Sequence, residues 1–352
     1  MKNQNLRFIS LVVALGLALG SAICGCTAAV APEQEQIVLK YGVGEPSTHF
    51  WSEAAVIIMD KIEQQTGGRV RFEKYFAGTL INPRECFAEI KTGVADISAL
   101  PIGLAPGGKL EVERALMGAY FGVGDVNVVR SMSAQVKSKY PELESDWAEY
   151  GKVLGWSTIL PFHLSSRKPV NTLDDFRGMT LRAWPAITPV FAALGAESLT
   201  MPSADVYSAL QKGTLDAATA AWEQLLTYRW AEVTKYHVYM NLATGGWGYV
   251  IVMNWDTWNS LPADIQQVFE DNYEAWIEEN HRKIVTVEQA GIGFATSLGN
   301  TFSELPQEEL DKFYDLMDAN FRAITADLDT KGYRATAIYN EIRRLVEEWR
   351  SS

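Results

Sequence analysis

The chain has 352 residues, of which 47% are hydrophobic, and a formal net charge of −12. This length predicts about two domains, and the excess of acidic groups excludes nucleic acids and anionic membrane surfaces as partners. A surface of this charge does not attract anions from a distance, so a site for a carboxylate must depend on local cations.

The N-terminus has the pattern of an export signal. Two basic residues precede an uncharged apolar run, residues 8–23, which is shorter than the roughly 20 residues that a membrane-spanning helix needs. The run I-C-G-C that ends at Cys26 resembles the cleavage site of bacterial lipoproteins. We expect a signal peptide at residues 1–25, a lipid anchor on Cys26 and a polar tether at residues 26–36, with ordinary signal cleavage nearby as the alternative. The expected location is the periplasm, and the anchor is the expected contact with the membrane.

Of the three cysteines, Cys86 alone lies beyond the predicted leader, so no disulfide is expected within the folded body. Its helix-like surroundings predict a buried and unreactive thiol. The histidines show no metal-ligand spacing, and we expect no metal and no cofactor. They are His49, His163, His237 and His281.

Alternating strand and helix patterns begin at residue 37. Residues 37–43 form an apolar run that predicts a strand, and apolar residues at four-residue spacing predict a helix over residues 50–65. Residues 69–76 return to strand character. Residues 82–83, an asparagine followed by a proline, are expected to begin a second helix, and residues 96–100 to form a short buried strand.

The same order recurs in the second half of the chain. Strand, helix, strand, helix and strand are expected at residues 180–183, 186–194, 197–201, 202–212 and 216–220. In both halves a Gly-x-x-Asp sequence leads from the last helix to the last strand, at Gly93 to Asp96 and at Gly213 to Asp216. Strands that alternate with helices predict parallel α/β sheets. Two copies predict two similar lobes, with a ligand site between them at the carboxyl ends of the strands.

Three further segments have helical patterns. Residues 172–175 match a capping box at the start of a short helix. Residues 262 to about 290 are expected to form one long helix of about 43 Å, at 1.5 Å per residue, which is long enough to cross both lobes. Residues 310–349 are helical again, with a break at Gly332.

Four motifs resemble one known family in their order and spacing. They are N-T-L-D-D-F-R-G-M-T-L-R at residues 171–182, L-G-A at 194–196, M-P-S-A-D-V-Y-S-A-L-Q-K-G-T-L-D at 201–216 and M-N-W-D-T-W-N-S-L-P at 253–262. On these motifs the chain resembles the solute-binding subunits of tripartite ATP-independent periplasmic (TRAP) transporters, in the branch that binds C4-dicarboxylates. The resemblance extends over nearly the whole chain beyond residue 38.

This resemblance implies a fold of the α/β class like that of periplasmic binding proteins. Such a fold has two lobes, a ligand cleft between them that closes by hinge bending, and a long helix that spans both. It also implies the membrane permease subunits of a TRAP transporter as partners. The expected division gives residues 37–158 and about 248–275 to the first lobe, 159–247 and about 276–304 to the second, and 305–352 to helices that pack across both.

Arg182 is the main candidate for ligand binding. In the family, an arginine that ends the strand after the F-R-G-M motif pairs with the ligand carboxylate, and here that residue is Arg182. The chemistry agrees, because a guanidinium flanked by Leu181 and Trp184 at the end of a predicted strand can hold a carboxylate through two parallel hydrogen bonds. The alternative is a structural ion pair with Glu197. Arg177, in the preceding turn, is expected to have a structural role.

Two positions depart from the family pattern. Residues 160–169 (L-P-F-H-L-S-S-R-K-P) lack the second arginine that many members have, and Ala220 stands where many have asparagine. A second carboxylate or a hydroxyl would be left unpaired at a cost of about 1–3 kcal/mol each, which favours an apolar or aromatic monocarboxylate. Besides Arg182 and Ala220, the expected ligand contacts are His49, Trp51, Phe162, Trp184, Trp222 and Trp247, with core packing as the alternative for each tryptophan.

The expected function is capture of a small organic carboxylate outside the cytoplasm and its delivery to a TRAP permease. No enzyme activity is expected, since the chain has no G-x-S-x-G, H-E-x-x-H, P-loop or dinucleotide-binding motif. One alternative is a sensor subunit that presents its ligand to a membrane receptor. A second, less favoured, is an exported enzyme.

Overall fold

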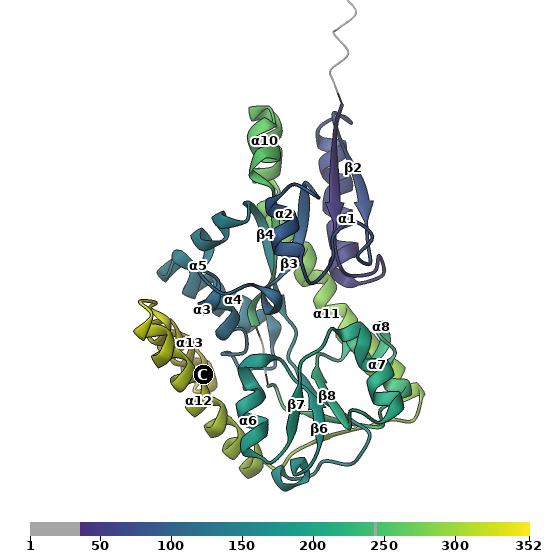
Figure 1. Ribbon diagram of the computed structural model, residues 1–352, viewed down its shortest axis with the longest axis vertical. Coiled ribbons are helices and arrows are strands. Elements are labelled where there is room, and N and C mark those ends of the chain that lie inside the picture. Colours follow the sequence, from purple (N-terminus) through teal and green to yellow (C-terminus); the bar gives the residue numbers. More distant parts are fainter. Residues whose placement is uncertain (1–35, 243–244) are drawn as a thin grey trace, which may run out of the picture. The chain divides into compact units, whose positions relative to one another are not determined.

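Two mixed β-sheets with helices around them form the fold in the computed structural model, which describes residues 36–242 and 245–352 (Figure 1). The predicted signal peptide, Cys26 and nearly all of the tether lie outside the described residues. The first sheet has the order β2-β1-β3-β10-β4 and the second β11-β9-β5-β8-β6-β7.

The strands have these bounds. The first sheet contains β1 (Ile37–Gly42), β2 (Val70–Tyr75), β3 (Ile97–Pro101), β4 (Lys152–Ile159) and β10 (Gly245–Met253). The second contains β5 (His163–Ser166), β6 (Thr180–Arg182), β7 (Glu197–Leu199), β8 (Ala217–Ala220), β9 (Tyr236–Tyr239) and β11 (Thr301–Glu304).

The helices surround these sheets. Those before β6 are α1 (Phe50–Gln65), α2 (Cys86–Lys91), α3 (Glu111–Ala115), α4 (Val126–Lys139) and α5 (Glu142–Ser145). Those after it are α6 (Thr188–Ala193), α7 (Ser203–Lys212), α8 (Glu223–Thr227), α9 (Trp255–Ser260), α10 (Ala263–Asp271), α11 (Tyr273–Ser297), α12 (Gln307–Thr330) and α13 (Ala335–Arg350). The capping box predicted at residues 172–175 is present, at the start of a short 3-10 helix.

The two halves of the chain repeat one arrangement, as predicted. β1 pairs in parallel with β2 and β3, and β6 pairs in parallel with β7 and β8. The aspartate of each Gly-x-x-Asp sequence has the same role in its sheet. Asp96 Oδ2 accepts a hydrogen bond from Lys40 N at 2.7 Å, and Asp216 Oδ2 accepts one from Thr180 N at 3.1 Å. Each carboxylate therefore ties the start of its own strand to the neighbouring strand.

Other strands make both sheets mixed rather than wholly parallel. β10 runs antiparallel to β3 and β4, and β5 runs antiparallel to β8 and β9. The predicted start of the second helix at residues 82–83 is also wrong, because Asn82 Oδ1 accepts from Arg84 N at 3.0 Å in a turn and α2 begins at Cys86. This bond is one that an N-cap residue makes, but residues 83–85 form a turn and the helix begins only after them.

The long helix predicted from residue 262 is divided. α10 ends at Asp271, and Asn272 separates it from α11. The Asn272 amide donates to Val268 O at 2.7 Å and to Gln65 Oε1 at 2.6 Å, so it joins α10 to the end of α1. α11 continues past the predicted end, to Ser297, and contacts both α1 and β4 in the first half of the fold and α8 in the second.

Two glycines let α11 closely approach β4 in the first half of the fold and the start of α8 in the second. A Cβ on Gly155, in β4, would lie 2.5 Å from the Cβ of Trp276 in α11. A Cβ on Gly291, in α11 itself, would lie 2.0 Å from the backbone oxygen of Trp222. Neither approach leaves room for a side chain at the glycine, so one helix is held against both halves of the molecule.

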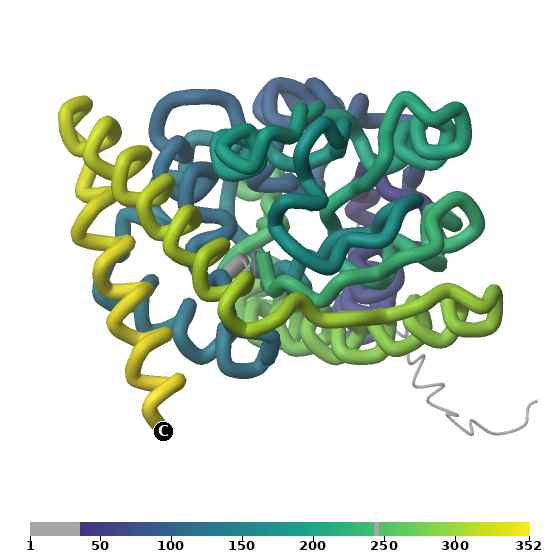
Figure 2. Tube along the Cα trace, turned by 90° about the horizontal axis from the view of Figure 1, so that it is seen from below, coloured from purple at the N-terminus to yellow at the C-terminus, as the bar shows by residue number. Residues whose placement is uncertain are grey.

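The two C-terminal helices form a pair that contacts both halves, and they break at Gly332 as predicted (Figure 2). In α12 the Asn320 amide donates to Ala186 O at 2.7 Å, just after β6. In α13, Ala337 O accepts from the Tyr140 hydroxyl at 3.1 Å, at the end of α4. No helix among residues 36–242 and 245–352 is both long and apolar enough to cross a membrane.

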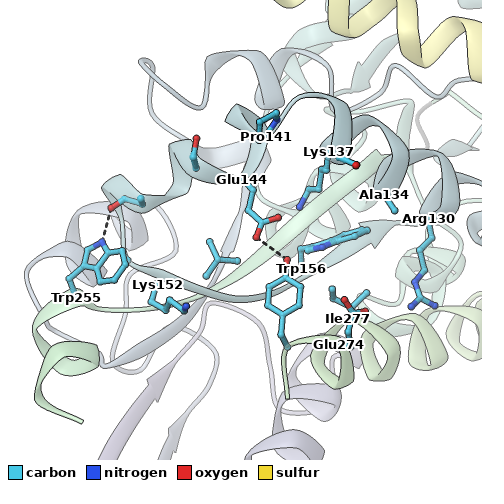
Figure 3. Close-up of a pocket in the computed structure, with 16 residues that line it drawn as sticks. Arg130, Ala134, Lys137, Pro141, Glu144, Lys152, Trp156, Trp255, Glu274 and Ile277 are labelled. Atoms are coloured by element: carbon cyan, nitrogen blue, oxygen red, sulfur yellow. Dashed lines mark hydrogen bonds between the residues drawn. The ribbon is translucent and has the colours of Figure 1, made fainter. Parts of the chain in front are cut away.

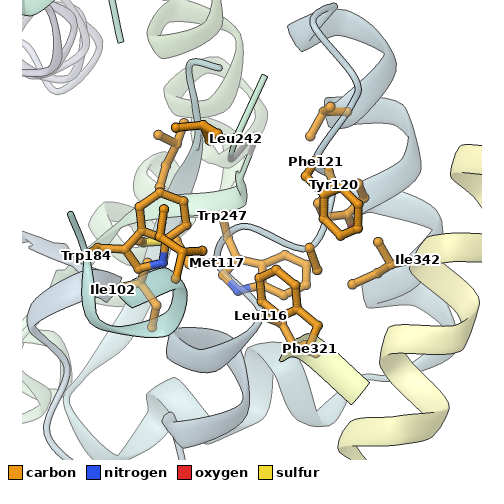
Figure 4. Close-up of a cluster of buried hydrophobic side chains, with 14 of the residues drawn as sticks. Ile102, Leu116, Met117, Tyr120, Phe121, Trp184, Leu242, Trp247, Phe321 and Ile342 are labelled. Carbon is orange, nitrogen blue, oxygen red and sulfur yellow. The ribbon is translucent and has the colours of Figure 1, made fainter. Parts of the chain in front are cut away.

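A large buried cluster unites aromatic and aliphatic side chains from both halves (Figure 4). Trp247 and Tyr120 meet edge to face, with ring centroids 6.4 Å apart, and Phe121 stacks on Phe321 at 5.9 Å. Cys86 belongs to the same cluster and is 3% exposed, and its burial raises the pKa of the thiol to about 12. The prediction of a buried thiol is therefore confirmed.

Candidate ligand-binding site

Arg182 ends β6, and backbone carbonyls hold its half-buried side chain. Its Nη1 donates to Thr219 O at 2.8 Å, and its Nε donates to Met201 O at 3.3 Å. A guanidinium has five N–H groups. Two of them donate to these carbonyls, and the other three lack an acceptor among the described residues. Burial lowers the pKa of Arg182 to about 10, which leaves it charged at neutral pH. Glu197 is exposed, and within the described chain Arg182 forms no ion pair with it or any other carboxylate.

Two tyrosines lie near this guanidinium, and a glutamate is linked to both of them. Tyr228, which follows α8, and Tyr249, on β10, both lie within electrostatic reach of Arg182. The Tyr249 hydroxyl donates to Glu45 Oε1, and Glu45 also lies within electrostatic reach of Tyr228. Burial raises the pKa of Glu45, although the bond from Tyr249 acts in the opposite direction.

Trp51 adds an indole ring to this group. Its ring centroid lies 3.4 Å from that of Tyr249, with an interplanar angle of 35°, and its Nε1 donates to Ser157 Oγ at 2.9 Å. Its position depends on His49, the N-cap of α1, whose Nδ1 accepts from Trp51 N at 3.3 Å. Burial lowers the pKa of His49 to about 3, so the imidazole is neutral and keeps this acceptor.

We call Arg182, Tyr228, Tyr249, Glu45 and Trp51 the Arg182 cluster. Its members stand where parallel strands of both sheets end. Arg182 is the last residue of β6, Glu45 follows β1, and Tyr249 pairs with the last residue of β3. Carboxyl ends of strands are the places where α/β folds bind small ligands.

Trp222 and Ala220 lie in the core of the second sheet. Trp222 is fully buried and stacks on His163, with ring centroids 4.4 Å apart and an interplanar angle of 14°. Tyr239 meets Trp222 edge to face at 5.4 Å. Ala220 is buried and pairs with His163 across β5 and β8. These surroundings correspond to core packing, the alternative considered for Trp222.

Trp247, Trp184 and Phe162 also have packing roles. Trp247 is 1% exposed, within the cluster of Figure 4, which also contains the buried Trp184. Trp184 and Phe162 meet nearly perpendicular, with ring centroids 5.2 Å apart. Phe162 is half-buried and packs against the same small apolar cluster as Trp51. Of the aromatic residues expected at the ligand, the structure therefore places Trp51 against Tyr249 of the Arg182 cluster, with His49 beside it.

Sequence reasoning missed three members of the Arg182 cluster. Glu45, Tyr228 and Tyr249 were not among the expected contacts. Glu45 could have been found, because it follows a predicted parallel strand by two residues, the criterion that selected Arg182. Tyr228 and Tyr249 carry no such sequence signal.

A separate cavity of about 650 Å³ lies among α4, α5, β4 and α11 (Figure 3). The Lys137 ammonium lies over the ring of Trp156, 4.4 Å from its centroid, and burial lowers the pKa of this lysine to about 8. The Tyr273 hydroxyl donates to Glu144 at 3.2 Å beside it. No member of the Arg182 cluster lines this cavity. Among the described residues, no group of histidine, cysteine, aspartate or glutamate side chains is arranged to hold a metal ion.

Comparison with protein families gives one assignment. The sequence model described as "Bacterial extracellular solute-binding protein, family 7" matches residues 41–327. The C4-dicarboxylate-binding periplasmic protein DctP of Rhodobacter capsulatus is 26% identical over 313 residues, which cover 84% of this chain and 88% of that protein. A solute-binding protein of Albidiferax ferrireducens is 27% identical over 177 residues, and this match covers about half of each chain, 50% and 51%.

Solved structures share the fold. A TRAP solute-binding protein from Rhodoferax ferrireducens T118, in complex with copurified benzoate, has a TM-score of 0.78 and 22% identity over 89% of this chain and 98% of that one. A marine metagenome TRAP solute-binding protein, in complex with 3-hydroxybenzoate, has a TM-score of 0.79 and 20% identity over 89% and 99%. These neighbours are two-lobed TRAP binding proteins, so their likeness confirms the predicted fold class. This chain belongs to bacterial extracellular solute-binding protein family 7, which provides the solute-binding subunits of TRAP transporters.

Proposed function

We propose that this protein binds a small organic carboxylate outside the cytoplasm, with Arg182 as the residue that holds the carboxylate, and passes it to a TRAP permease. The observation that carries this proposal is the Arg182 guanidinium, which two backbone carbonyls orient and no described carboxylate neutralises. A charge that is half-buried without a counter-ion is costly, and a ligand carboxylate would remove that cost.

The body of the ligand is proposed to be flat and at least partly apolar. Trp51 and Tyr249 present neighbouring ring systems beside Arg182, and Tyr228 adds a third ring. Aromatic faces favour planar groups, which stack on them or meet their edges. The benzoate and 3-hydroxybenzoate bound by two proteins of the same fold are ligands of this shape.

The proposal predicts the outcome of a thermal-shift screen with small acids and their uncharged amides. Aromatic or branched monocarboxylates should raise the melting temperature, and the matching amides should not, because an amide lacks the charge that Arg182 binds. Arg182→Ala should abolish the shifts and weaken binding in calorimetry by about 100-fold, a loss of roughly 2.7 kcal/mol.

Arg177→Ala is the matched control. This arginine lies one turn earlier and forms an exposed ion pair with Asp174 at 3.5 Å, so its removal should leave the shifts intact. Stabilisation by the amides as strongly as by the acids, or full binding by Arg182→Ala, would show that the carboxylate does not bind at Arg182.

Delivery to a permease is a separate part of the proposal. Uptake of the identified acid by vesicles that contain the cognate membrane subunits should require this protein, and Arg182→Ala should not support it. Binding without any stimulation of uptake would favour the sensor alternative, in which the same protein presents its ligand to a membrane receptor.

A further inference from the structure

Two carboxyl groups lie within electrostatic reach of each other here: Glu45, in the Arg182 cluster, and Glu223, outside it. Glu45 lies within electrostatic reach of Tyr228 and of Glu223, a buried glutamate on α8. Burial raises the pKa of Glu223 to about 8 and also raises that of Glu45. Neither glutamate forms an ion pair with a described lysine or arginine, and Arg182 is the cation that faces the two tyrosines. A ligand with a lone carboxylate would satisfy Arg182 and add a further negative charge next to Glu45.

Glu45 is positioned by one bond and retains further capacity to accept. The Tyr249 hydroxyl donates to Oε1, and the backbone oxygen of Glu45 accepts from Ala77 N at 2.7 Å, which fixes the loop after β1. A carboxylate offers about four acceptor positions. The described chain supplies one side-chain donor to them, Tyr249, and the same tyrosine lies within electrostatic reach of Arg182.

We propose that Glu45 is a specificity-determining residue, which accepts a hydrogen bond from a hydroxyl or a protonated nitrogen that the ligand carries away from its carboxylate. The inference rests on the proposed function, because it assumes that the carboxylate occupies Arg182. It narrows the ligand from any small acid to an acid with a donor group, as in a hydroxy acid or a zwitterion. Acids without such a group leave the Glu45 carboxylate buried and short of donors, at a cost that lowers their affinity.

Matched pairs of acids test this proposal. Benzoate is compared by calorimetry with the meta and para isomers of hydroxybenzoate and of aminomethylbenzoate, and hexanoate is compared with its terminal hydroxy and amino derivatives. In at least one series a donor-bearing acid should bind about tenfold or more tightly than its parent, since one charge-assisted hydrogen bond contributes that much. Equal affinities within every series that binds would overturn the role of Glu45 and leave the proposed function intact.

Substitutions at Glu45 distinguish the two kinds of donor. Glu45→Gln keeps an acceptor oxygen and removes the charge, so it should retain a preference for the hydroxyl and lose a preference for the ammonium. Glu45→Leu should lose both preferences and bind the parent acids at least as well as before, because it removes a like charge. A preference that survives in Glu45→Leu would place the donor contact elsewhere and would overturn the proposal.

Glu73→Gln is the matched control. Glu73 also accepts from a tyrosine hydroxyl, that of Tyr75 at 2.9 Å, but this pair is exposed on β2. Its substitution should change no affinity in any series. If no acid of any series binds to the unaltered protein, both the proposed function and this inference are wrong, whereas binding of parent acids alone contradicts only the inference.

Discussion

The acceptors of Arg182 are both backbone oxygens, Thr219 O within β8 and Met201 O just after β7. Carbonyl oxygens orient a guanidinium without neutralising it, so the side chain is held in place with its charge available. A structural ion pair would have left less of that charge for a ligand. Elsewhere in the chain, a carboxyl group is also buried without a partner of opposite charge.

Glu113, on α3, carries this carboxyl group. It is 1% exposed, its carboxyl oxygens have no hydrogen-bond partner within the described chain, and burial raises its pKa from 4.5 to about 8. A carboxyl whose pKa is raised by folding stabilises the fold fully below pH 4.5, and this contribution is lost as the pH rises through 8.

Glu113→Gln should therefore change the pH dependence of stability. Near pH 5 the variant and the parent should unfold at similar denaturant concentrations, and near pH 9 the variant should be more stable by about 1–3 kcal/mol. Urea unfolding at both pH values measures this, with the exposed Glu85→Gln as control. A parallel decline of both proteins with pH would show that Glu113 is already ionised.

Among single residues, the sequence predicted Arg182, because a strand end and a family motif both point to this position. It could not distinguish a tryptophan at a ligand site from one in the core. Trp51 and Trp222 each follow a predicted strand, yet Trp51 is half-buried against Tyr249 and Trp222 is fully buried against His163. The difference depends on which neighbours the tertiary fold supplies, and local sequence does not contain that information.

Among the elements, α11 contacts both halves of the fold closely, at β4 and at the start of α8. Alanine at Gly155 or at Gly291 would place a Cβ within 2.5 Å and 2.0 Å of Trp276 and of Trp222 O, respectively. A Cβ on Gly293, two residues further along the same helix, would meet no atom of the described residues within 4 Å. Gly155 and Gly291 therefore test the close contacts of α11, and Gly293 tests helix propensity alone.

Gly155→Ala and Gly291→Ala should each destabilise the protein by about 1–3 kcal/mol, since the helix or strand must move to admit the methyl group. Gly293→Ala should be neutral or stabilise by up to about 1 kcal/mol, because alanine is the better helix former. Chemical unfolding of the three variants gives the comparison. Equal effects at Gly291 and Gly293 would mean that α11 does not rest against residue 222.

Element types were predictable where periodicity or a repeat was clear, as for α1, α7 and the strands β1, β6 and β8. Strands β4, β5, β9, β10 and β11 were not predicted. All four residues of β5, H-L-S-S, are buried although two are serines, and β10 is almost wholly apolar without alternation. Strands that are buried on both faces show no alternation of apolar and polar residues, so periodicity along the chain does not reveal them.

For the molecule as a whole, the Arg182 cluster draws on both sheets. Arg182 belongs to the second sheet, while Tyr249 belongs to the first and Glu45 and Trp51 follow its strand β1. A ligand held at both ends would therefore join the two halves. Arg84 and Asp205 also form an exposed ion pair across them, at 3.8 Å between Nη2 and Oδ2.

Binding of an acid identified in the screen should lower the radius of gyration measured by small-angle X-ray scattering. Asp205→Arg should weaken the binding of that acid by about two- to fivefold. The exposed pair with Arg84 contributes at most about 1 kcal/mol, and the substitution replaces it with repulsion between two arginines. Asp174→Arg, on an exposed turn beside Arg177, is the control. An unchanged radius of gyration at saturation would mean that the two halves do not close on the ligand.

The repeated Gly-x-x-Asp bond also bears on the order in which the chain can assemble. The bond from Thr180 to Asp216 closes a loop of 36 residues, and that from Lys40 to Asp96 closes one of 56. β6, β7 and β8 come from one continuous stretch, residues 180–220. In the first sheet, one edge of β3 pairs with β10, which begins much later in the chain, at Gly245. Loop closure costs more as the loop lengthens. The edges of β3 and β4 that pair with β10 therefore stay open until β10 is present, and unpaired strand edges are where a folding chain is most open to wrong pairing.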